Sequence, residues 1–136
     1  IIISEEVITL KMDIDCIRDI LLQVEETPFT VYRDSDESDE KDSELSFIDK
    51  YDDKTLLYHI NLANELGLIK ASICMGMSSV LDLSAQGHLF LADIREENVW
   101  NKTKEISKQV GASSLDTVKQ IAVNVVSSLI SGYFQK

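Results

Sequence analysis

The stretch from Lys54 to Ile94 constrains the fold most, because a helical pattern is followed there by two short strand patterns and a second helical pattern. The first part repeats apolar residues at spacings of four, three and three, the periodicity of one face of an α-helix: Leu56, Ile60, Ala63 and Leu66. Asp52 or Asp53 can cap the start of this helix, and Gly67 can end it in a left-handed conformation. The order of helix, hairpin and helix predicts an α+β fold of the winged helix-turn-helix type, with additional C-terminal helices.

The hairpin is predicted from period-two alternation, which is typical of half-buried strands. Its first strand alternates the apolar set Ile69, Ala71, Ile73 and Met75 with Lys70, Ser72 and Cys74. Gly76 supplies a turn, and the returning strand from Val80 places Leu81 and Leu83 on one face. The tip, residues 75–79, contains no Lys or Arg and is therefore a poor phosphate contact. Its two Met residues suit an adaptable apolar contact instead.

The outer face of the helix from Lys54 carries the candidate binding residues. The predicted DNA- or partner-binding set consists of four residues on that face and two at the wing tip: Lys54, Tyr58, Asn61, Glu65, Met75 and Met77. In a recognition helix such residues would meet the major groove, where Asn can read adenine and Lys can reach guanine or phosphate. A merely solvated face explains the same pattern equally well.

Several short motifs occur in a fixed order along the chain. They are Met12-Asp13, Ile17-Arg18-Asp19-Ile20-Leu21-Leu22, Tyr58-His59, Leu66-Gly67-Leu68-Ile69, Leu83-Ser84, Gly87-His88, Phe90-Leu91 and Trp100. In this order they resemble a small family of bacterial and phage proteins known as domain of unknown function 2513, over roughly residues 12–129. The resemblance implies a winged-helix fold, and it supplies no activity or catalytic residue to carry over. The acidic stretch after the first helix is longer than the family leads us to expect.

Charge is unevenly distributed along this acidic chain, whose net charge is −11. Residues 34–44 carry seven acidic side chains and one basic one, which predicts a solvated loop. The Asp spacing there is superficially that of a calcium loop, but the central Gly and the flanking helix pair are missing. Residues 98–136 carry five basic and two acidic side chains. An acidic body disfavours non-specific attraction to nucleic acid, and only this last segment is locally basic.

The rest of the chain supplies flanking elements around the predicted winged helix. We expect a single domain over residues 1–136, with a core at 12–97 and a C-terminal helical extension at 98–136. The other predicted elements are a strand at Val7–Leu10, a helix from Asp13 to Glu26, a strand or extended link at Phe29–Tyr32, a strand through Leu45 and Phe47, a helix from Ser84 to about Glu97, a helix from Val99 to Val110 ended by Gly111, and a helix that begins with a capping box at Ser113 and Asp116 and ends at Gly132. The residues expected to be largely buried are Ile17, Leu21, Ile60, Leu66, Ile69 and Phe90.

The last helix carries a long apolar stripe that must be buried against something. The stripe consists of Leu115, Val118, Ala122, Val125 and Leu129. It can fold back on the first helix, aided by Trp100, or meet its twin across a two-fold axis. Val126 and Ile130 widen the apolar surface beyond what one packing face needs, which favours a homodimer through this helix.

No motif of catalysis, cofactor binding or metal binding is present. The chain has no Gly-rich phosphate loop, no His-Glu-x-x-His pair and no Cys-x-x-Cys. His59 and His88 are isolated and are expected to be structural hydrogen-bonding groups, and a metal site shared with Cys74 has no motif spacing behind it. Cys16 and Cys74 are expected to be buried thiols of a cytosolic protein. We therefore predict a protein without enzymatic activity, cofactor or metal.

Two functions fit these residues. The first is a DNA-binding regulator, favoured slightly because winged helices so often bind DNA. The second is a protein-interaction module that kept the fold without the DNA charge, as Glu65 and the uncharged wing suggest. The sequence contains no apolar run of 18 residues and no signal peptide, so we expect a cytoplasmic protein that does not enter a membrane.

Overall fold

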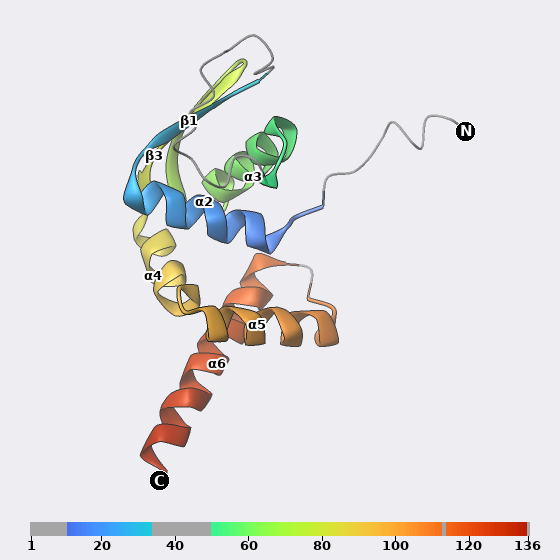
Figure 1. Cartoon of the computed structure of the whole chain (residues 1–136), viewed down its shortest axis with the longest axis vertical. Helices are drawn as coiled ribbons and strands as arrows, with labels where there is room; N and C mark the ends of the chain where they lie inside the picture. Colours follow the sequence, from blue (N-terminus) through green and yellow to red (C-terminus); the bar gives the residue numbers. More distant parts are fainter. Residues whose placement is uncertain (1–10, 34–49, 113, 136) are drawn as a thin grey trace, which may run out of the picture. The chain divides into compact units, whose positions relative to one another are not determined.

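The computed structural model describes residues 11–33, 50–112 and 114–135 (Figure 1). Its elements, in chain order, are α2 (Ile14–Glu26), β1 (Phe29–Tyr32), α3 (Asp53–Glu65), β2 (Ile69–Cys74), β3 (Met77–Leu83), α4 (Ala85–Ile94), α5 (Glu97–Val110) and α6 (Leu115–Phe134). The α+β class is therefore confirmed. The predicted strand at Val7–Leu10, the acidic loop at 34–44 and the predicted strand through Leu45 and Phe47 lie outside the described residues.

The chain divides into two compact units after Ser84. The sequence placed the start of the C-terminal extension at residue 98, whereas helix α4 groups with α5 and α6 in the second unit. Helix α4 ends at Ile94 and α5 begins at Glu97, so the break between them comes a few residues earlier than predicted.

Short side chains at the helix starts explain where α2 and α3 begin. The Asp13 carboxylate accepts hydrogen bonds from the backbone N–H groups of Asp15, at 2.9 Å, and Cys16. The Asp52 carboxylate accepts one from the backbone N–H of Thr55 at 2.7 Å. Each cap satisfies donors that the first helical turn leaves without a partner. Of the two predicted caps for α3, Asp52 is the one used.

The sheet of the first unit has three antiparallel strands in the order β1-β3-β2. The predicted hairpin is confirmed, but its returning strand begins at Met77 and not at Val80: Ile69 pairs with Leu83 at its base and Cys74 with Met77 at its tip. Gly76 has a φ of 84°, which its turn requires and which a residue with a side chain rarely adopts. The segment left open as strand or link is the third strand, β1. Within the described residues, α3 is the one helix between β1 and β2, so the helix-turn-helix pair itself stays a prediction.

A β-bulge changes which residues of β3 are buried. Lys70 pairs with Asp82, but Ala71 pairs with Val80, so Leu81 is an extra residue on its strand. The alternation of faces therefore slips: Val80 and Leu83 are buried, and Leu81 is exposed. The prediction that Leu81 and Leu83 share one face was wrong, because it assumed an unbroken period of two.

The core of the first unit forms where α2 and α3 pack against each other and against the sheet. Its fully buried apolar side chains include Cys16, Ile17, Ile20, Leu21, Leu56, Ile60, Ala63, Leu68 and Val80. The predicted burial of Ile17, Leu21, Ile60 and Ile69 is confirmed. Leu66 is 39% exposed, contrary to prediction, because it caps the helix and no longer follows its periodicity.

The second unit is built from α4, α5 and α6, with α6 packed against α5 and α4. Its buried side chains include Phe90, as predicted, and Leu91, Ile94, Trp100, Val118 and Ala122. Gly111 ends α5 with a φ of 68°, as predicted. The predictions for both ends of α6 were wrong. Ser114, and not Ser113, caps the start of α6 by accepting a hydrogen bond from the N–H of Thr117, and α6 continues through Gly132 to Phe134. A single Gly in a helix costs only about 1 kcal/mol, so it need not end one.

Candidate functional site

Helix α3 presents its predicted binding residues along one line. Its buried side uses Leu56, His59, Ile60 and Ala63. Lys54, Asn61 and Glu65 are consequently exposed, and Tyr58, on the same line, is half-buried. The spacings of four, three and four residues keep all four side chains on one face of the helix.

His59 lies beneath this face and holds two elements together. Its Nε2 accepts a hydrogen bond from the backbone N–H of Asp13 at 2.7 Å, and its Nδ1 lies 2.8 Å from the carbonyl oxygen of Thr55. Because a carbonyl oxygen can only accept, Nδ1 is the donor in the contact with Thr55. The ring of Tyr58 contacts it edge-on, with centroids 5.2 Å apart. His59 is therefore a structural hydrogen-bonding group, as predicted, whereas His88 is exposed.

The tip of the hairpin is apolar and exposed. Met75 is 100% exposed at the turn, Ile73 and Cys74 are exposed before it, and Met77 is half-buried after it. Strand β1 adds the exposed Tyr32, which pairs with Met77. We call Tyr32, Ile73, Met75 and Met77 the tip cluster; the strand register places Tyr32 and Met77 on one face of the sheet and Ile73 on the other. Cys74 was expected to be buried, and it is exposed because it ends an edge strand at the tip.

One charged residue at the tip could not be assigned from the sequence. The backbone N–H of Arg33 donates to the carbonyl oxygen of Gly76 at 2.8 Å, which brings this exposed residue beside the turn. The strand pattern of Phe29–Tyr32 is the sequence signal that could have placed Arg33. This pattern alone, however, does not reveal which other strand Phe29–Tyr32 pairs with.

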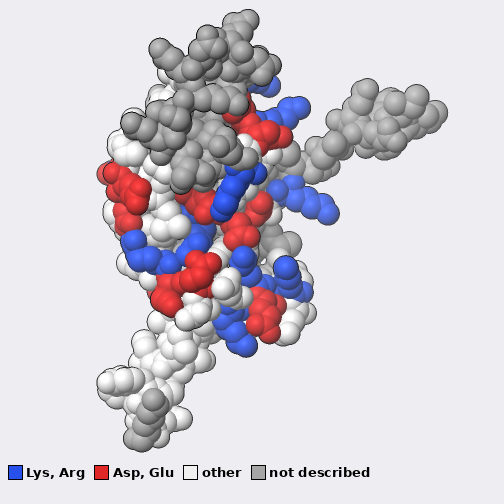
Figure 2. Space-filling model, in the orientation of Figure 1, with Lys and Arg blue, Asp and Glu red and all other residues white. Residues whose placement is uncertain are grey.

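In Figure 2 the Lys and Arg side chains lie among Asp and Glu side chains, whereas the end of α6 shows neither. On α3, Lys54 follows Asp52 and Asp53 directly. The side-chain and backbone hydrogen bonds of Thr55 lower the pKa of the Asp52 carboxyl, and nearby Lys54 lowers it further, so a carboxylate accompanies the lysine. Two lysines of the locally basic C-terminal segment lie on α5, where Lys102 is 3.8 Å from Glu105 and Lys104 lies over the Trp100 ring.

A polar cluster fastens the residues just before α3 to α2. The Tyr51 hydroxyl donates to Asp19 Oδ2 at 2.7 Å, and Lys50 Nζ lies 3.5 Å from the same oxygen. Burial, followed by the hydrogen bond to the Asp19 carboxylate, raises the pKa of Tyr51. Burial, with Asp13 and Asp19 nearby, raises the pKa of Cys16 to about 12, so this thiol is protonated at neutral pH. A protonated, fully buried thiol is a poor nucleophile.

Most of the predicted dimer stripe on α6 is already buried. Leu115, Val118, Ala122 and Val125 are buried where α6 packs in its unit, and only Leu129, which is 59% exposed, is not.

Among the described residues, no three His, Cys, Asp or Glu side chains come together in a way that could hold a metal ion.

These observations define an α+β protein whose three-stranded antiparallel sheet is covered by α2 and α3 and followed by a unit of three helices. The family described as hypothetical protein DUF2513 matches residues 11–113, and the chain belongs to this family. The resemblance inferred from the ordered motifs is thereby confirmed.

None of the helices in residues 11–33, 50–112 and 114–135 combines the length and apolar character that a bilayer span requires.

The chain is also similar to a protein of Haemophilus influenzae that is described as uncharacterised. The two are 33% identical over 128 residues, which cover 90% of this chain and all of that protein. No solved structure matches the chain.

Proposed function

We propose that this protein is a non-catalytic binding module of the winged-helix type, whose ligand is another protein held by the tip cluster and the exposed face of α3. The observation that carries the proposal is the tip cluster itself. Tyr32, Ile73 and Met75 project apolar surface at the end of the hairpin, and residues 71–79 contain no basic side chain. Burying such exposed apolar surface against an apolar surface of a partner is favourable. The flexible Met side chain can also adapt to a partner surface of irregular shape.

The order of the elements supports the winged-helix part of the proposal. Helix α3 leads directly into the β2–β3 hairpin, and β1, which follows α2, adds the third strand beside β3. In such an arrangement α3 corresponds to the recognition helix and residues 75–79 to the wing. The two binding regions then belong to consecutive elements of the first unit.

The composition of the α3 face also supports a protein ligand. Tyr58 and Asn61 lie between one cation, Lys54, and one anion, Glu65. A mixed polar rim beside an apolar centre is typical of protein–protein interfaces. One lysine flanked by carboxylates gives little attraction to a phosphate backbone, because the affinity for DNA grows with the number of phosphates neutralised.

Site-specific photo-crosslinking tests the proposal. A photoreactive residue at Met75 should capture a protein from an extract of the source cells, and one at Asp82, exposed on the same strand pair but away from the tip, should not. The captured protein, once purified, should bind the wild type and should bind Met75→Ser with an affinity roughly tenfold weaker, about the cost of exposing one large apolar anchor. Equal affinity of the two proteins would remove the tip from the interface.

DNA is the second candidate, because Lys54 and Asn61 share one exposed face and Arg33 lies beside the wing. If this candidate holds, Lys54→Ala and Arg33→Ala should each reduce the salt dependence of binding by about one unit of slope. Asn61→Ala should relax sequence preference by about 1–3 kcal/mol. Fluorescence anisotropy with duplex DNA measures both. The proposed function would be wrong, and DNA would be the ligand, if the wild type binds duplex DNA tightly and in a salt-dependent way, these variants lose that binding, and no protein is captured at Met75.

A further inference from the structure

Helix α6 carries a second apolar stripe beside the one that is buried. The first stripe, from Leu115 to Val125, packs within its unit. The second stripe, which we define as Val123, Val126, Ile130 and Tyr133, is spaced by three, four and three residues. At 100° per residue its centre lies about a quarter turn round the helix from the first. The second stripe cannot use the same neighbours.

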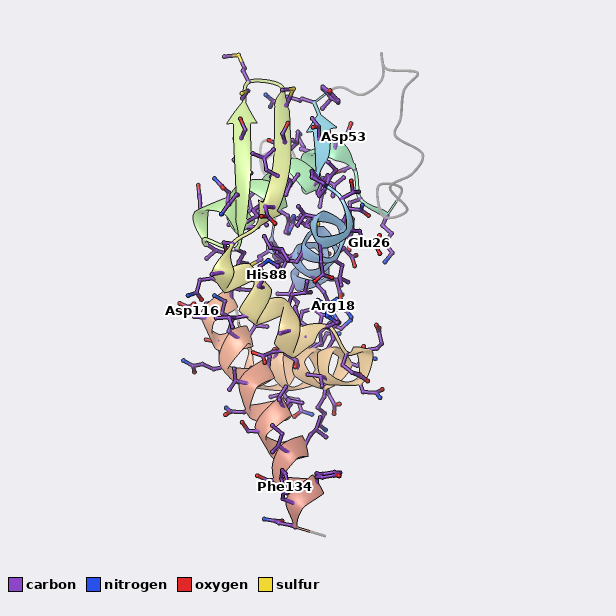
Figure 3. All side chains as sticks on the ribbon, turned by 90° about the vertical axis from the view of Figure 1, so that its left-hand side faces the viewer. Arg18, Glu26, Asp53, His88, Asp116 and Phe134 are labelled. Atoms are coloured by element: carbon purple, nitrogen blue, oxygen red, sulfur yellow. The ribbon has the colours of Figure 1, made fainter. Side chains whose placement is uncertain are left out.

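Three of the four residues of this second stripe are exposed, and Val126 is half-buried, in the tail of α6, which we define as residues 120–135. The exposed apolar side chains of the tail are Val123, Leu129, Ile130, Tyr133 and Phe134. Tyr133 is 71% exposed and Phe134 78% exposed. In Figures 1 and 3 the turns around Phe134 have no other helix of their unit beside them.

The tail has no charge, and its two sides differ. No Asp, Glu, Lys or Arg occurs between Lys119 and Lys136, in a chain whose net charge is −11. The side opposite the second stripe carries exposed small polar residues, which are Asn124, Ser127, Ser128 and Ser131. The tail is therefore amphipathic: the apolar side chains of the two stripes occupy somewhat more than half of its circumference, and the small polar side chains occupy the rest.

We infer that the second stripe is a self-association surface, through which two copies of this chain pair their α6 tails about a two-fold axis. Spacings of three and four residues are those by which one helix packs along another. The occupant is a second copy because the stripe is self-complementary: two such faces meet apolar to apolar. Charge supports this choice, since the tail gives no acidic group to attract a basic partner and lets two acidic bodies approach without like charges in contact.

The size of the surface is sufficient for such a pair. With about 150–250 Å² for each fully exposed aromatic side chain, the exposed apolar side chains of the tail present at most on the order of 600 Å² per copy, counting Leu129 and Phe134, which flank the second stripe. Two copies that covered all of this area would together remove about 1,200 Å² from water, the lower end of the range for specific interfaces. Charged groups are depleted from the centre of such interfaces, as they are from this tail.

Sedimentation of the full chain at about 1–100 µM tests the inference, since this range brackets micromolar dissociation constants. The wild type should be a dimer at the upper end. Ile130→Glu combined with Tyr133→Glu places two carboxylates in the second stripe and should raise the dissociation constant by roughly a hundredfold or more, because each would be buried without a partner. The control, Asn124→Glu combined with Ser131→Glu, adds the same charge on the polar side of the tail and should leave the dimer intact.

Circular dichroism and thermal melting of the same variants separate association from folding. The stripe variant should keep the helical content of the wild type as a monomer, whereas Val125→Glu, in the buried first stripe, should melt at a lower temperature. A wild type that is monomeric throughout, or a control that dissociates as readily as the stripe variant, would overturn the inference. A monomeric wild type whose stripe variant melts early would show that the stripe packs within its own chain, which overturns it as well.

Discussion

His59 accepts a hydrogen bond from the backbone N–H of Asp13 although 46 residues separate them in the chain. Asp13 is also the residue whose carboxylate caps α2, so the histidine ring fixes the capping residue itself against α3. The contact makes the start of one helix depend on the interior face of another. It thereby couples the two helices that cover the sheet.

We expect His59→Phe to destabilise the protein by about 1–3 kcal/mol, because it leaves the N–H of Asp13 without its acceptor beside a buried ring. The measurement is the free energy of unfolding in urea. The matched control is His88→Phe at an exposed position, which should change that free energy by no more than about 0.5 kcal/mol. If both substitutions have the same small effect, His59 does not secure the helix start.

The two cysteines should differ strongly in reactivity. Cys74 is exposed at the hairpin tip, whereas Cys16 is buried with a pKa raised to about 12. The attacking species is the thiolate, so a thiol reagent at neutral pH should modify one equivalent at once and the second only on unfolding. Cys74→Ser should abolish the fast phase. A fast phase that persists in Cys74→Ser would mean that the environment of Cys16 is open.

Alkaline pH should weaken the first unit. The folded pKa values of Tyr51 and Cys16 are both raised, so folding holds their protons more tightly than the unfolded chain does. Their stabilisation is complete below the ordinary pKa values, about 8.5 for Cys and about 10 for Tyr, and is lost as the pH rises above them. Tyr51→Phe, which removes the donor to Asp19, should flatten the decline of the unfolding free energy above about pH 10. If the unfolding free energy of that variant declines as steeply as that of the wild type, groups other than Tyr51 cause the decline.

The cap of α3 should contribute in the opposite pH range. The lowered pKa of Asp52 means that its stabilisation is present above the ordinary carboxyl pKa and is lost as the pH falls through the folded value. We expect Asp52→Ala to cost about 1 kcal/mol at neutral pH and Asp52→Asn, which keeps an acceptor for the N–H of Thr55, to cost less. Denaturation at neutral and acidic pH measures this difference. Equal losses in the two variants would argue against a capping role.

Local patterns predicted the elements whose residues interact with near neighbours. Helix α3, its cap at Asp52 and the hairpin around Gly76 follow from periodicity and turn chemistry over a few residues. Leu66 and Leu81 were assigned wrongly for a shared reason: the periodicity was extended past a helix end in one case and through a bulge in the other. A bulge is set by the pairing of two strands and leaves no sign in the alternation of one.

The candidate site was predictable to the same extent. Lys54, Asn61 and Glu65 lie on one face because a helix requires it, and their exposure follows from the buried residues between them. Arg33 and Tyr32 could not be placed at the hairpin tip from sequence, because their position depends on β1 pairing with β3. In the sequence, the second stripe of α6 appears only as additional apolar residues beside the first stripe. The burial of Val118 and Ala122 in the structure shows that the first stripe is the one packed within the unit.

The position of β3 at the centre of the sheet has a consequence for biosynthesis. Strand β2 finds its neighbour across a two-residue turn, a step of microseconds, whereas Tyr32 pairs with Met77 some 45 residues later in the chain. At about 5–20 residues per second, a ribosome needs several seconds to synthesise that interval. During this time β1 has been synthesised, but the strand with which it pairs has not. A nascent chain stalled before Met77 would therefore expose an unpaired strand, and this is the stage at which a chaperone would have the most to bind.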